Sequence, residues 1–298
     1  MSGSIFVFAE TPAAVAELVT LARDLNRSCR VVACGCPDPE IYADCGADGV
    51  LSLGGGLAVS YAKALAALMK ERGAEILLAS NTGIGRELVA ATAGFLDCAM
   101  VSDAQTMEFV EDTLEIEHLI YGGAVVARER CPLPCVATFG AGRRRAAVGS
   151  CPVEWITCQP DERITLVSEA PIEKKGVDLR EAERVVGAGM GFGTEEELQT
   201  AAALAEALGA ALGCSRSLAE DKHWFDEYIG LSGVQISPKL YFALGISGQV
   251  QHLVGARGAQ LIVAVNRDEN APIMHECDYG IVGDMFRIVP LLIKEITG

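Results

Sequence analysis

The chain alternates short apolar runs with segments in which apolar residues recur at helical spacing. Residues 5–9 form the first apolar run and predict a strand, and Thr11 with Pro12 then predicts the N-cap and first residue of an amphipathic helix. The same alternation predicts further strands at residues 30–33, 49–53 and 76–79 and helices at about 60–72 and 85–95. Apolar strands separated by single helices are typical of a parallel sheet covered on both faces.

The pattern changes after about residue 105. No segment between there and residue 171 has a clear helical period. Strand-like pieces occur at 119–121, 135–139 and 164–167. We therefore expect this stretch to extend the first sheet.

A second alternation follows the polar segment 172–178, which predicts a linker and hinge between domains 1–171 and 172–298. Thr194 and Glu197 form a capping box for a helix. Strands are predicted at residues 185–186, 210–214, 241–246, 261–265 and 279–282, with a further helix at 247–254. The sequence therefore predicts an α/β protein with two parallel-sheet domains.

Charge excludes several classes of function. The 298 residues include 24 Lys plus Arg and 40 Asp plus Glu, so the formal net charge is −16 and the pI is near 4.7. Nucleic acid and anionic membranes bind clustered Lys and Arg, so we expect neither as a partner. No apolar stretch reaches the roughly 18 to 20 residues that span a bilayer, and we expect no membrane insertion.

The eleven cysteines contain no CxxC pair. Zinc ribbons and ferredoxin-type clusters need tighter, repeated spacing, so we predict no metal site. The N-terminus also lacks the basic flank and long apolar core of an export signal. We therefore expect a cytoplasmic protein whose cysteines are small buried hydrophobes.

A glycine run lies between a predicted strand and the capped helix of the second domain. Gly187, Gly189, Gly191 and Gly193 alternate with other residues, where a dinucleotide phosphate could be held. The register differs from the Rossmann fingerprint, because Phe192 occupies the sixth position. A tight turn with close packing is favoured over a direct phosphate clamp.

Polar residues gather after the strands of the second domain, at the edge where open parallel sheets bind ligands. The candidate cofactor-binding residues are Ser215, Arg216, Leu231, Ser232, Gly233, Ser247, Gly248, Gln251, His252, Asn266 and Asp284. Each of these could also be a cap or turn residue, but the whole set at one edge favours a binding site.

The chemistry of these residues suits a flavin nucleotide. Ser247 as a helix N-cap would present backbone N–H groups to a pyrophosphate. Arg216 and His252 would supply positive charge to a ring that becomes anionic on reduction, and the Ser232 hydroxyl could bond a ring nitrogen. Asn266, with Asp284, suits the ribose and adenine edges.

The second domain resembles the electron transfer flavoprotein α subunit. The resemblance is dense over residues 231–292, which begin LSGVQISPKLYFALGISGQVQHL, and it extends to residues 179–193 and 204–221. The first half is similar more loosely, through IFVFAE at residue 5 and YGGAVVA at residue 121.

The resemblance implies FAD as cofactor and a role for each matched residue. Ser215 and Arg216 would lie at the FAD, with the arginine beside the isoalloxazine ring, and Ser232 would bond the ring near N5. Ser247 would serve the ribityl and pyrophosphate, and His252 would lie near the pyrimidine side of the ring. Asn266 and Asp284 would hold the adenosine part.

Two positions depart from the family pattern. The family usually has Gln-Thr where this chain has Leu231 and Ser232, and it usually has arginine where this chain has Met190. The first departure removes one amide contact to the flavin, and the second bears on the docking of a partner.

The function that the resemblance implies is electron relay. An FAD-bearing α subunit would pair with a β subunit and pass electrons between an acyl-CoA dehydrogenase-like flavoprotein and another redox partner, without acting alone on a small substrate. Two alternatives stay open: a subunit of a stable electron-bifurcating complex that uses NADH, and a non-redox nucleotide-binding module.

Overall fold

A computed structural model of the chain describes residues 3–111, 113–123, 125–140, 145–170 and 178–298. The chain divides into two compact units, which are described separately. The first comprises Met1–Ile120 and Val125–Ala170, and the second comprises Tyr121–Ala124 and Pro171–Gly298. The predicted linker lies, apart from its last residue, outside the described residues.

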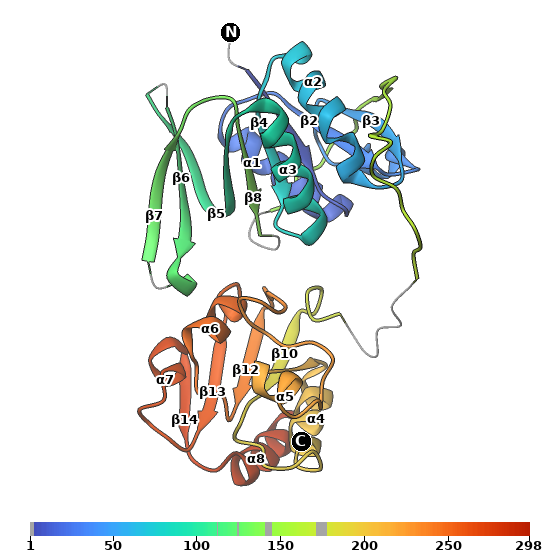
Figure 1. Cartoon of the computed structure of the whole chain (residues 1–298). Helices are drawn as coiled ribbons and strands as arrows, with labels where there is room; N and C mark the ends of the chain where they lie inside the picture. The colour runs from blue at the N-terminus through green and yellow to red at the C-terminus, as the bar shows by residue number, and fades with distance from the viewer. Residues whose placement is uncertain (1–2, 112, 124, 141–144, 171–177) are drawn as a thin grey trace. The chain divides into compact units, whose positions relative to one another are not determined.

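The first unit is built on a nine-stranded sheet in the order β7-β6-β5-β8-β4-β1-β2-β3-β9 (Figure 1). Its strands are β1 (Ser4–Phe8), β2 (Cys29–Gly35), β3 (Gly49–Gly55), β4 (Ala74–Ser80), β5 (Ala99–Val110), β6 (Thr113–Ile120), β7 (Val125–Cys131), β8 (Cys135–Phe139) and β9 (Val153–Trp155). Strands β5, β6 and β7 pair antiparallel, and the remaining pairs are parallel.

Helices cover both faces of this sheet, as the apolar strands predict. The helices are α1 (Pro12–Asp24), α2 (Ala62–Arg72) and α3 (Gly83–Leu96), with 3₁₀ turns at Pro39–Tyr42 and Ala58–Tyr61; a third 3₁₀ turn, Tyr121–Gly123, belongs to the second unit. Ile5 and Val7 pack with α1 on one face, while Phe6 and Phe8 pack with α2 and α3 on the other. The alternation of side chains along β1 therefore supplies both cores.

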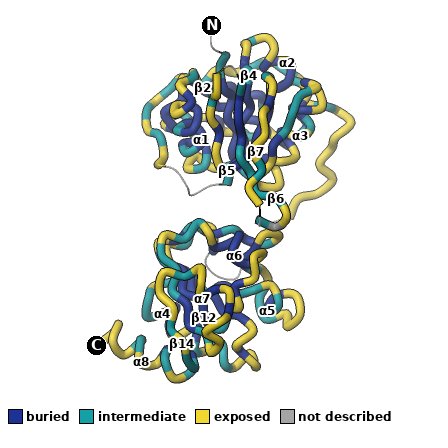
Figure 2. The backbone as a smooth tube through the Cα atoms, turned by 90° about the vertical axis from the view of Figure 1, so that its left-hand side faces the viewer, coloured by how far each residue is buried: buried dark blue, intermediate teal, exposed yellow. Residues whose placement is uncertain are grey.

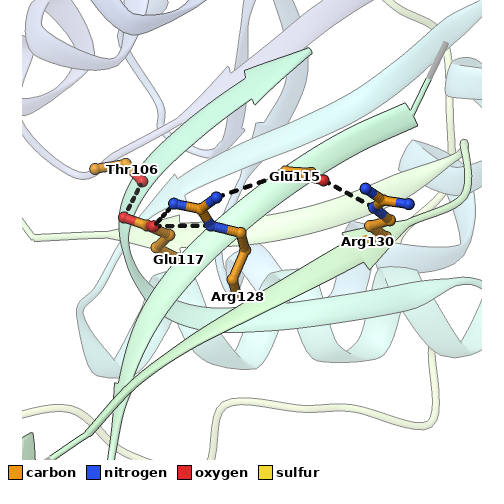
Figure 3. Close-up of polar contacts among 5 residues, drawn as sticks. All are labelled: Thr106, Glu115, Glu117, Arg128 and Arg130. Carbon is orange, nitrogen blue, oxygen red and sulfur yellow. Dashed lines mark hydrogen bonds and ion pairs between the residues drawn. The ribbon is translucent and has the colours of Figure 1, made fainter. Parts of the chain in front are cut away.

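A ladder of charged residues joins the antiparallel strands β6 and β7, and the Thr106 hydroxyl of β5 donates to it through Glu117 (Figure 3). Arg128 Nη2 lies 2.5 Å from Glu117 Oε1, and Arg130 Nε donates to Glu115 Oε1 over 2.7 Å. The two residues of each pair lie directly opposite each other on β6 and β7. Glu115 is buried, with 7% of its surface exposed. Opposite charges that face each other across neighbouring strands stabilise the pairing of those strands. Such pairs support β7, whose residues are mostly exposed and contribute little to the hydrophobic core.

The second unit contains a five-stranded, wholly parallel sheet in the order β11-β10-β12-β13-β14 (Figure 1). Its strands are β10 (Arg184–Ala188), β11 (Ala211–Cys214), β12 (Leu240–Leu244), β13 (Ile262–Asn266) and β14 (Tyr279–Val282). Its helices are α4 (Leu198–Leu208), α5 (Arg216–Glu220), α6 (Val250–Ala256), α7 (Ile273–Glu276) and α8 (Met285–Thr297).

Two cores again lie on opposite faces of this sheet. Val185 and Tyr241 pack with α6 and α7, whereas Val186 and Phe242 pack with α4, α5 and α8. The inner strands are buried and much of α8 is exposed (Figure 2). All eleven cysteines are free thiols, and burial raises the pKa of the buried ones, such as Cys214.

The predicted alternation of strands and helices is confirmed in both units, with several corrections. The strand predicted at residues 164–167 is wrong, because that segment is exposed and has no strand pairing. The capping box is only partly formed: Glu197 accepts from the backbone N–H of Thr194, but α4 begins one residue after Glu197 with no side-chain cap. Helices α5, α7 and α8 and strands β5, β7 and β9 were not predicted, and only the end of β6 was.

Within the described residues, each helix is too short or too polar to span a membrane.

Candidate functional site

The topology of the second sheet places a crevice at its carboxyl edge. Strand β10 comes first in the chain but lies between β11 and β12 in the sheet. The chain therefore adds β11 on one side of β10 and then crosses back to add β12 on the other side. In open parallel sheets a ligand binds at this point of reversal, outside the carboxyl ends of the strands.

A cavity of about 770 Å³ lies at this edge. Its volume falls within the roughly 300 to 1,000 Å³ typical of small-molecule sites. Segments that follow all five strands line it, including Gly191, Arg216, Ser247, Arg267 and Met285. Among the predicted site residues, those that line the cavity are Ser215, Arg216, Leu231, Ser232, Ser247, Gln251, His252 and Asn266.

Ser215 and Arg216 join β11 to α5. The Ser215 N–H donates to the Ala188 carbonyl, but its buried Oγ has no hydrogen-bond partner among the described residues. The Arg216 guanidinium is exposed and its Nε lies 2.5 Å from Glu220 Oε2, one turn along the same helix. This pair keeps the arginine at the mouth of the cavity as a cation and lowers the pKa of Glu220.

The loop after β12 differs from its predicted form. We expected Ser247 to cap a helix, but α6 begins at Val250 with Gln249 as N-cap, so that prediction is wrong. Gly248 has a φ of +80° and packs so tightly against Ile273 that a Cβ would lie 2.4 Å from its backbone nitrogen. The chain therefore bends before the helix starts, and the N-cap is two residues later than predicted, at Gln249.

This bend leaves a row of free backbone donors at the cavity. In the described structure, the amide N–H groups of residues 246–249 donate to no carbonyl or side chain. Ile246, Ser247 and Gln249 line the cavity. Consecutive free amides form a concave donor site for anions, so a pyrophosphate would bind a loop here rather than a helix terminus.

His252 lies on the first turn of α6 and is held from behind by Tyr241. Its Nε2 lies 2.7 Å from the Tyr241 hydroxyl, and both residues are buried. A Cβ on Gly187 would meet that hydroxyl at 2.3 Å, so the glycine makes room for the tyrosine. His252 Nδ1 is buried and makes no hydrogen bond of normal geometry within the described residues.

Burial corrects the predicted charge of His252. Desolvation lowers the pKa of its imidazole to about 4, although the carbonyl of Ile229 partly opposes this shift. The ring is therefore neutral at neutral pH, and the prediction that it supplies positive charge is wrong. It offers hydrogen bonding to a ligand instead.

Leu231, Ser232 and Gln251 form another wall of the cavity. The Leu231 N–H donates to the Gln251 carbonyl over 2.7 Å, which joins this loop to α6. The Ser232 hydroxyl lies 2.9 Å from the hydroxyl of Tyr228, a cavity residue that the sequence pattern did not single out. Gly233 lies behind this wall, where a Cβ would be 2.2 Å from the Tyr228 carbonyl.

Asn266 and Asp284 both have structural partners within the second unit. Asn266 Nδ2 donates to the Ile246 carbonyl over 2.8 Å and so braces the loop after β12. Asp284 does not line the cavity: it caps α8 through the Phe286 N–H and lies 3.0 Å from Arg267. Arg267 does line it and was missed, although its position directly after Asn266 is the same signal that identified its neighbour.

The glycine run is confirmed as a close-packing turn. A Cβ on Gly189 would lie 2.4 Å from the Gly245 carbonyl oxygen, and one on Gly191 would lie 2.7 Å from the Gly245 Cα. The run therefore brings the ends of β10 and β12 together, and only Gly191 and Met190 of this turn line the cavity.

The cavity fits a dinucleotide such as FAD. It combines free backbone amides at residues 246–249 with two buried polar atoms that lack partners among the described residues, Ser215 Oγ and His252 Nδ1. Buried polar groups are normally hydrogen-bonded, so such atoms mark positions that a ligand would satisfy. Arg216 and Arg267 add cations to its lining, which also holds the acidic residues Asp221 and Asp268.

The fold and the cavity thus define a two-unit α/β protein with a nucleotide-type site at its second sheet. Comparison with known proteins agrees: residues 178–257 match the electron transfer flavoprotein FAD-binding domain, and residues 7–160 match the electron transfer flavoprotein domain.

Curated relatives cover nearly the whole chain. Protein FixB of Escherichia coli is 35% identical, and the alignment covers 98% of each chain. Protein FixB of Shigella dysenteriae gives the same identity and coverage. A putative electron transfer flavoprotein subunit of Escherichia coli, YdiR, is 38% identical over 80% of this chain. The chain therefore belongs to the electron transfer flavoprotein α-subunit family, which includes FixB, and its second unit carries an FAD-binding domain.

Proposed function

We propose that the chain binds FAD in the cavity at the carboxyl edge of the second sheet and relays electrons between a flavin dehydrogenase of the acyl-CoA dehydrogenase type and another redox partner. The observation that carries this proposal is the pair of buried, unpartnered polar atoms, Ser215 Oγ and His252 Nδ1, in the wall of that cavity. FAD supplies the redox chemistry when bound, and the protein supplies binding, orientation and electrostatics.

The proposed division of the site follows the donors available. The amides of residues 246–249 hold the pyrophosphate, while Arg216 and the Ser232 hydroxyl lie at the ring. His252 offers a neutral ring nitrogen to the pyrimidine side. Asn266 serves the adenosine end, with Asp284 acting through its ion pair to Arg267.

We further propose that the chain works as a heterodimer. Residues 172–298 would form the FAD domain, and residues 1–171 would contact a β subunit, as the family assignment suggests. Gly233 and Gly248 would contribute by close packing behind the binding loops, and Leu231 and Gln251 by closing the wall.

The test is a purified complex of the chain with its co-expressed β subunit. We expect a yellow protein with about one FAD in this cavity, bleached when an acyl-CoA dehydrogenase and its acyl-CoA are added. Arg216→Ala should retain FAD but make its reduction less favourable, since a cation near the ring stabilises the charge gained. A colourless complex that cannot be reconstituted with FAD would overturn the proposal.

A further inference from the structure

Two buried rings lie at the cavity wall, Tyr241 on β12 and His252 on α6. Tyr241 Oη lies 2.7 Å from His252 Nε2, and the ring centroids are 6.0 Å apart. Tyr241 is fully buried, and His252 is buried while it lines the cavity. The distance alone leaves open which of the two atoms is the donor, because that depends on the tautomer of the histidine.

The Tyr241 hydroxyl has a single hydrogen-bond partner in the described structure, His252 Nε2. Close to the hydroxyl lies Gly187, where a Cβ would be 2.3 Å from Oη. Gly187 has no side chain that could accept a hydrogen bond, and its strand β10 pairs with neighbouring strands on both sides. The proton of the hydroxyl therefore has Nε2 as its acceptor.

Counting the unpaired groups gives the direction of this hydrogen bond. Burial lowers the pKa of His252 to about 4, so at neutral pH the ring has one N–H and one bare nitrogen. If Tyr241 donates to Nε2, then Nδ1 carries the ring proton and is the one atom of the pair left unpaired among the described residues. If His252 donated instead, the Tyr241 proton and a bare Nδ1 would both be unpaired. Unpaired buried groups cost free energy, so Tyr241 is the donor.

We propose that Tyr241 is a positioning residue that fixes His252 as its Nδ1–H tautomer, so that the cavity wall offers bound FAD a neutral hydrogen-bond donor. The inference rests on the proposed function, which places the pyrimidine side of the flavin ring at His252. That side of the ring carries carbonyl oxygens, which accept hydrogen bonds. The donor is set before FAD binds, and the buried Nδ1 then gains the partner that it lacks within the described residues.

The tautomer can be measured directly in the complex with the β subunit after FAD has been removed. Nitrogen-15 NMR of histidine-labelled protein distinguishes a protonated ring nitrogen from a bare one, and His252→Ala identifies the signals of this ring. In the wild type we expect a protonated Nδ1 and a bare Nε2. Tyr241→Phe removes one oxygen and keeps the ring. In this variant we expect the proton to move mainly to Nε2, the nitrogen on which histidine carries it more often in water.

The same variant should bind FAD more weakly. If about one molecule in ten keeps the Nδ1–H tautomer, the apparent dissociation constant rises by about tenfold, because binding must select that form. Titration of the FAD-free complex with FAD, followed by flavin fluorescence, measures this constant. In a His252→Ala background, Tyr241→Phe should leave the affinity unchanged, because the ring that it orients is absent.

Tyr42→Phe is the matched control. It removes another buried tyrosine hydroxyl, which donates to the Ala9 carbonyl in the first unit. Its affinity for FAD and the signals of His252 should equal those of the wild type.

The outcomes separate the two proposals. A bare Nδ1 in the wild type, a ring protonated on both nitrogens, or a tautomer unchanged in Tyr241→Phe would overturn the positioning role. An equal loss of affinity in both backgrounds would also overturn it, because Tyr241 would then act without His252. If the wild type takes up FAD in these cases, the proposed function stays intact. A wild-type complex that takes up no FAD would overturn the proposed function and, with it, the role of the donor, whichever tautomer is found.

Discussion

The polar residues at the carboxyl edges of the two sheets differ in whether they have hydrogen-bond partners. At the edge of the first sheet, the side chains bind one another. Glu10 accepts from the Ser80 hydroxyl over 2.7 Å and also from the Thr82 hydroxyl, and Asn81 donates to Asp103 over 2.9 Å. Each of these groups already has a partner within the unit.

At the edge of the second sheet, polar groups are left open. Ser215 Oγ and His252 Nδ1 are buried without partners in the described structure, and the amides of residues 246–249 are free. Leaving one buried polar group unpaired costs about 1 to 3 kcal/mol. A ligand that pairs such groups in a cavity would stabilise the folded state. The comparison shows that the same parallel topology builds a closed edge, at which polar groups pair with one another, or an open edge, at which some polar groups stay unpaired.

The largest expected effect comes from a bulky side chain in the turn after β10, which packs against the end of β12. Gly189→Val would place a Cβ 2.4 Å from the Gly245 carbonyl oxygen, and backbone cannot yield as a side chain does. We expect Gly189→Val to lower the free energy of unfolding of the second unit by about 3 kcal/mol. We also expect the variant to lose FAD binding. Urea unfolding followed by Trp224 fluorescence, in a Trp155→Phe background, measures it.

A matched control exists in the first unit. Gly94 lies inside α3, and a Cβ added there would meet no atom within 4 Å, so Gly94→Ala should stabilise by up to about 1 kcal/mol. An unchanged unfolding midpoint for Gly189→Val would show that the edge of the second sheet is looser than its glycine contacts indicate.

Acid should weaken the second unit through His252. Its folded-state pKa is about 4 against an ordinary value of 6.5, so the unfolded chain binds the proton more readily. The unfolding free energy is therefore fully retained above pH 6.5 and falls by about 3 kcal/mol as the pH drops to 4. Comparing urea unfolding of wild type and His252→Gln across this range tests it; equal slopes would contradict the prediction.

A smaller loss is expected when the support of His252 is removed. Tyr241→Phe leaves the buried Nε2 without its partner at 2.7 Å and should cost about 2 kcal/mol in the second unit. Tyr42→Phe is the control in the first unit, because its buried hydroxyl donates to the Ala9 carbonyl. Tyr42→Phe should shift the unfolding transition reported by Trp155 and leave the one reported by Trp224 unchanged. The reverse result would show that the two units do not unfold independently.

The smallest effect is expected at the closed edge. Thr82 caps α3 by accepting from the Gly85 N–H over 3.0 Å, so Thr82→Ala should cost about 1 kcal/mol in the first unit. Thr82→Ser should retain most of the stability because it keeps the hydroxyl. The midpoint potential of bound FAD should be unchanged in both, and a shift would show that the closed edge also serves the flavin.

Local periodicity was sufficient to predict most of the fold. The buried strands and the long helices α1 to α4 have apolar patterns strong enough to be identified without tertiary contacts. The meander β5 to β7 was hardly recognised, because its strands are polar and depend on cross-strand pairs such as Glu117 with Arg128. Helices α5 and α7 span five and four residues, too few to show a helical period.

The sequence by itself determined the fold class, the family and the sheet edge at which the polar candidate residues gather, because these depend on residue types in order along the chain. Only the tertiary structure decided the state of individual groups. The neutrality of His252 depends on burial beneath Tyr241, and the free amides at residues 246–249 depend on the packing of Gly248 against Ile273. These properties come from distances between residues that are apart in the sequence, and no local pattern encodes them.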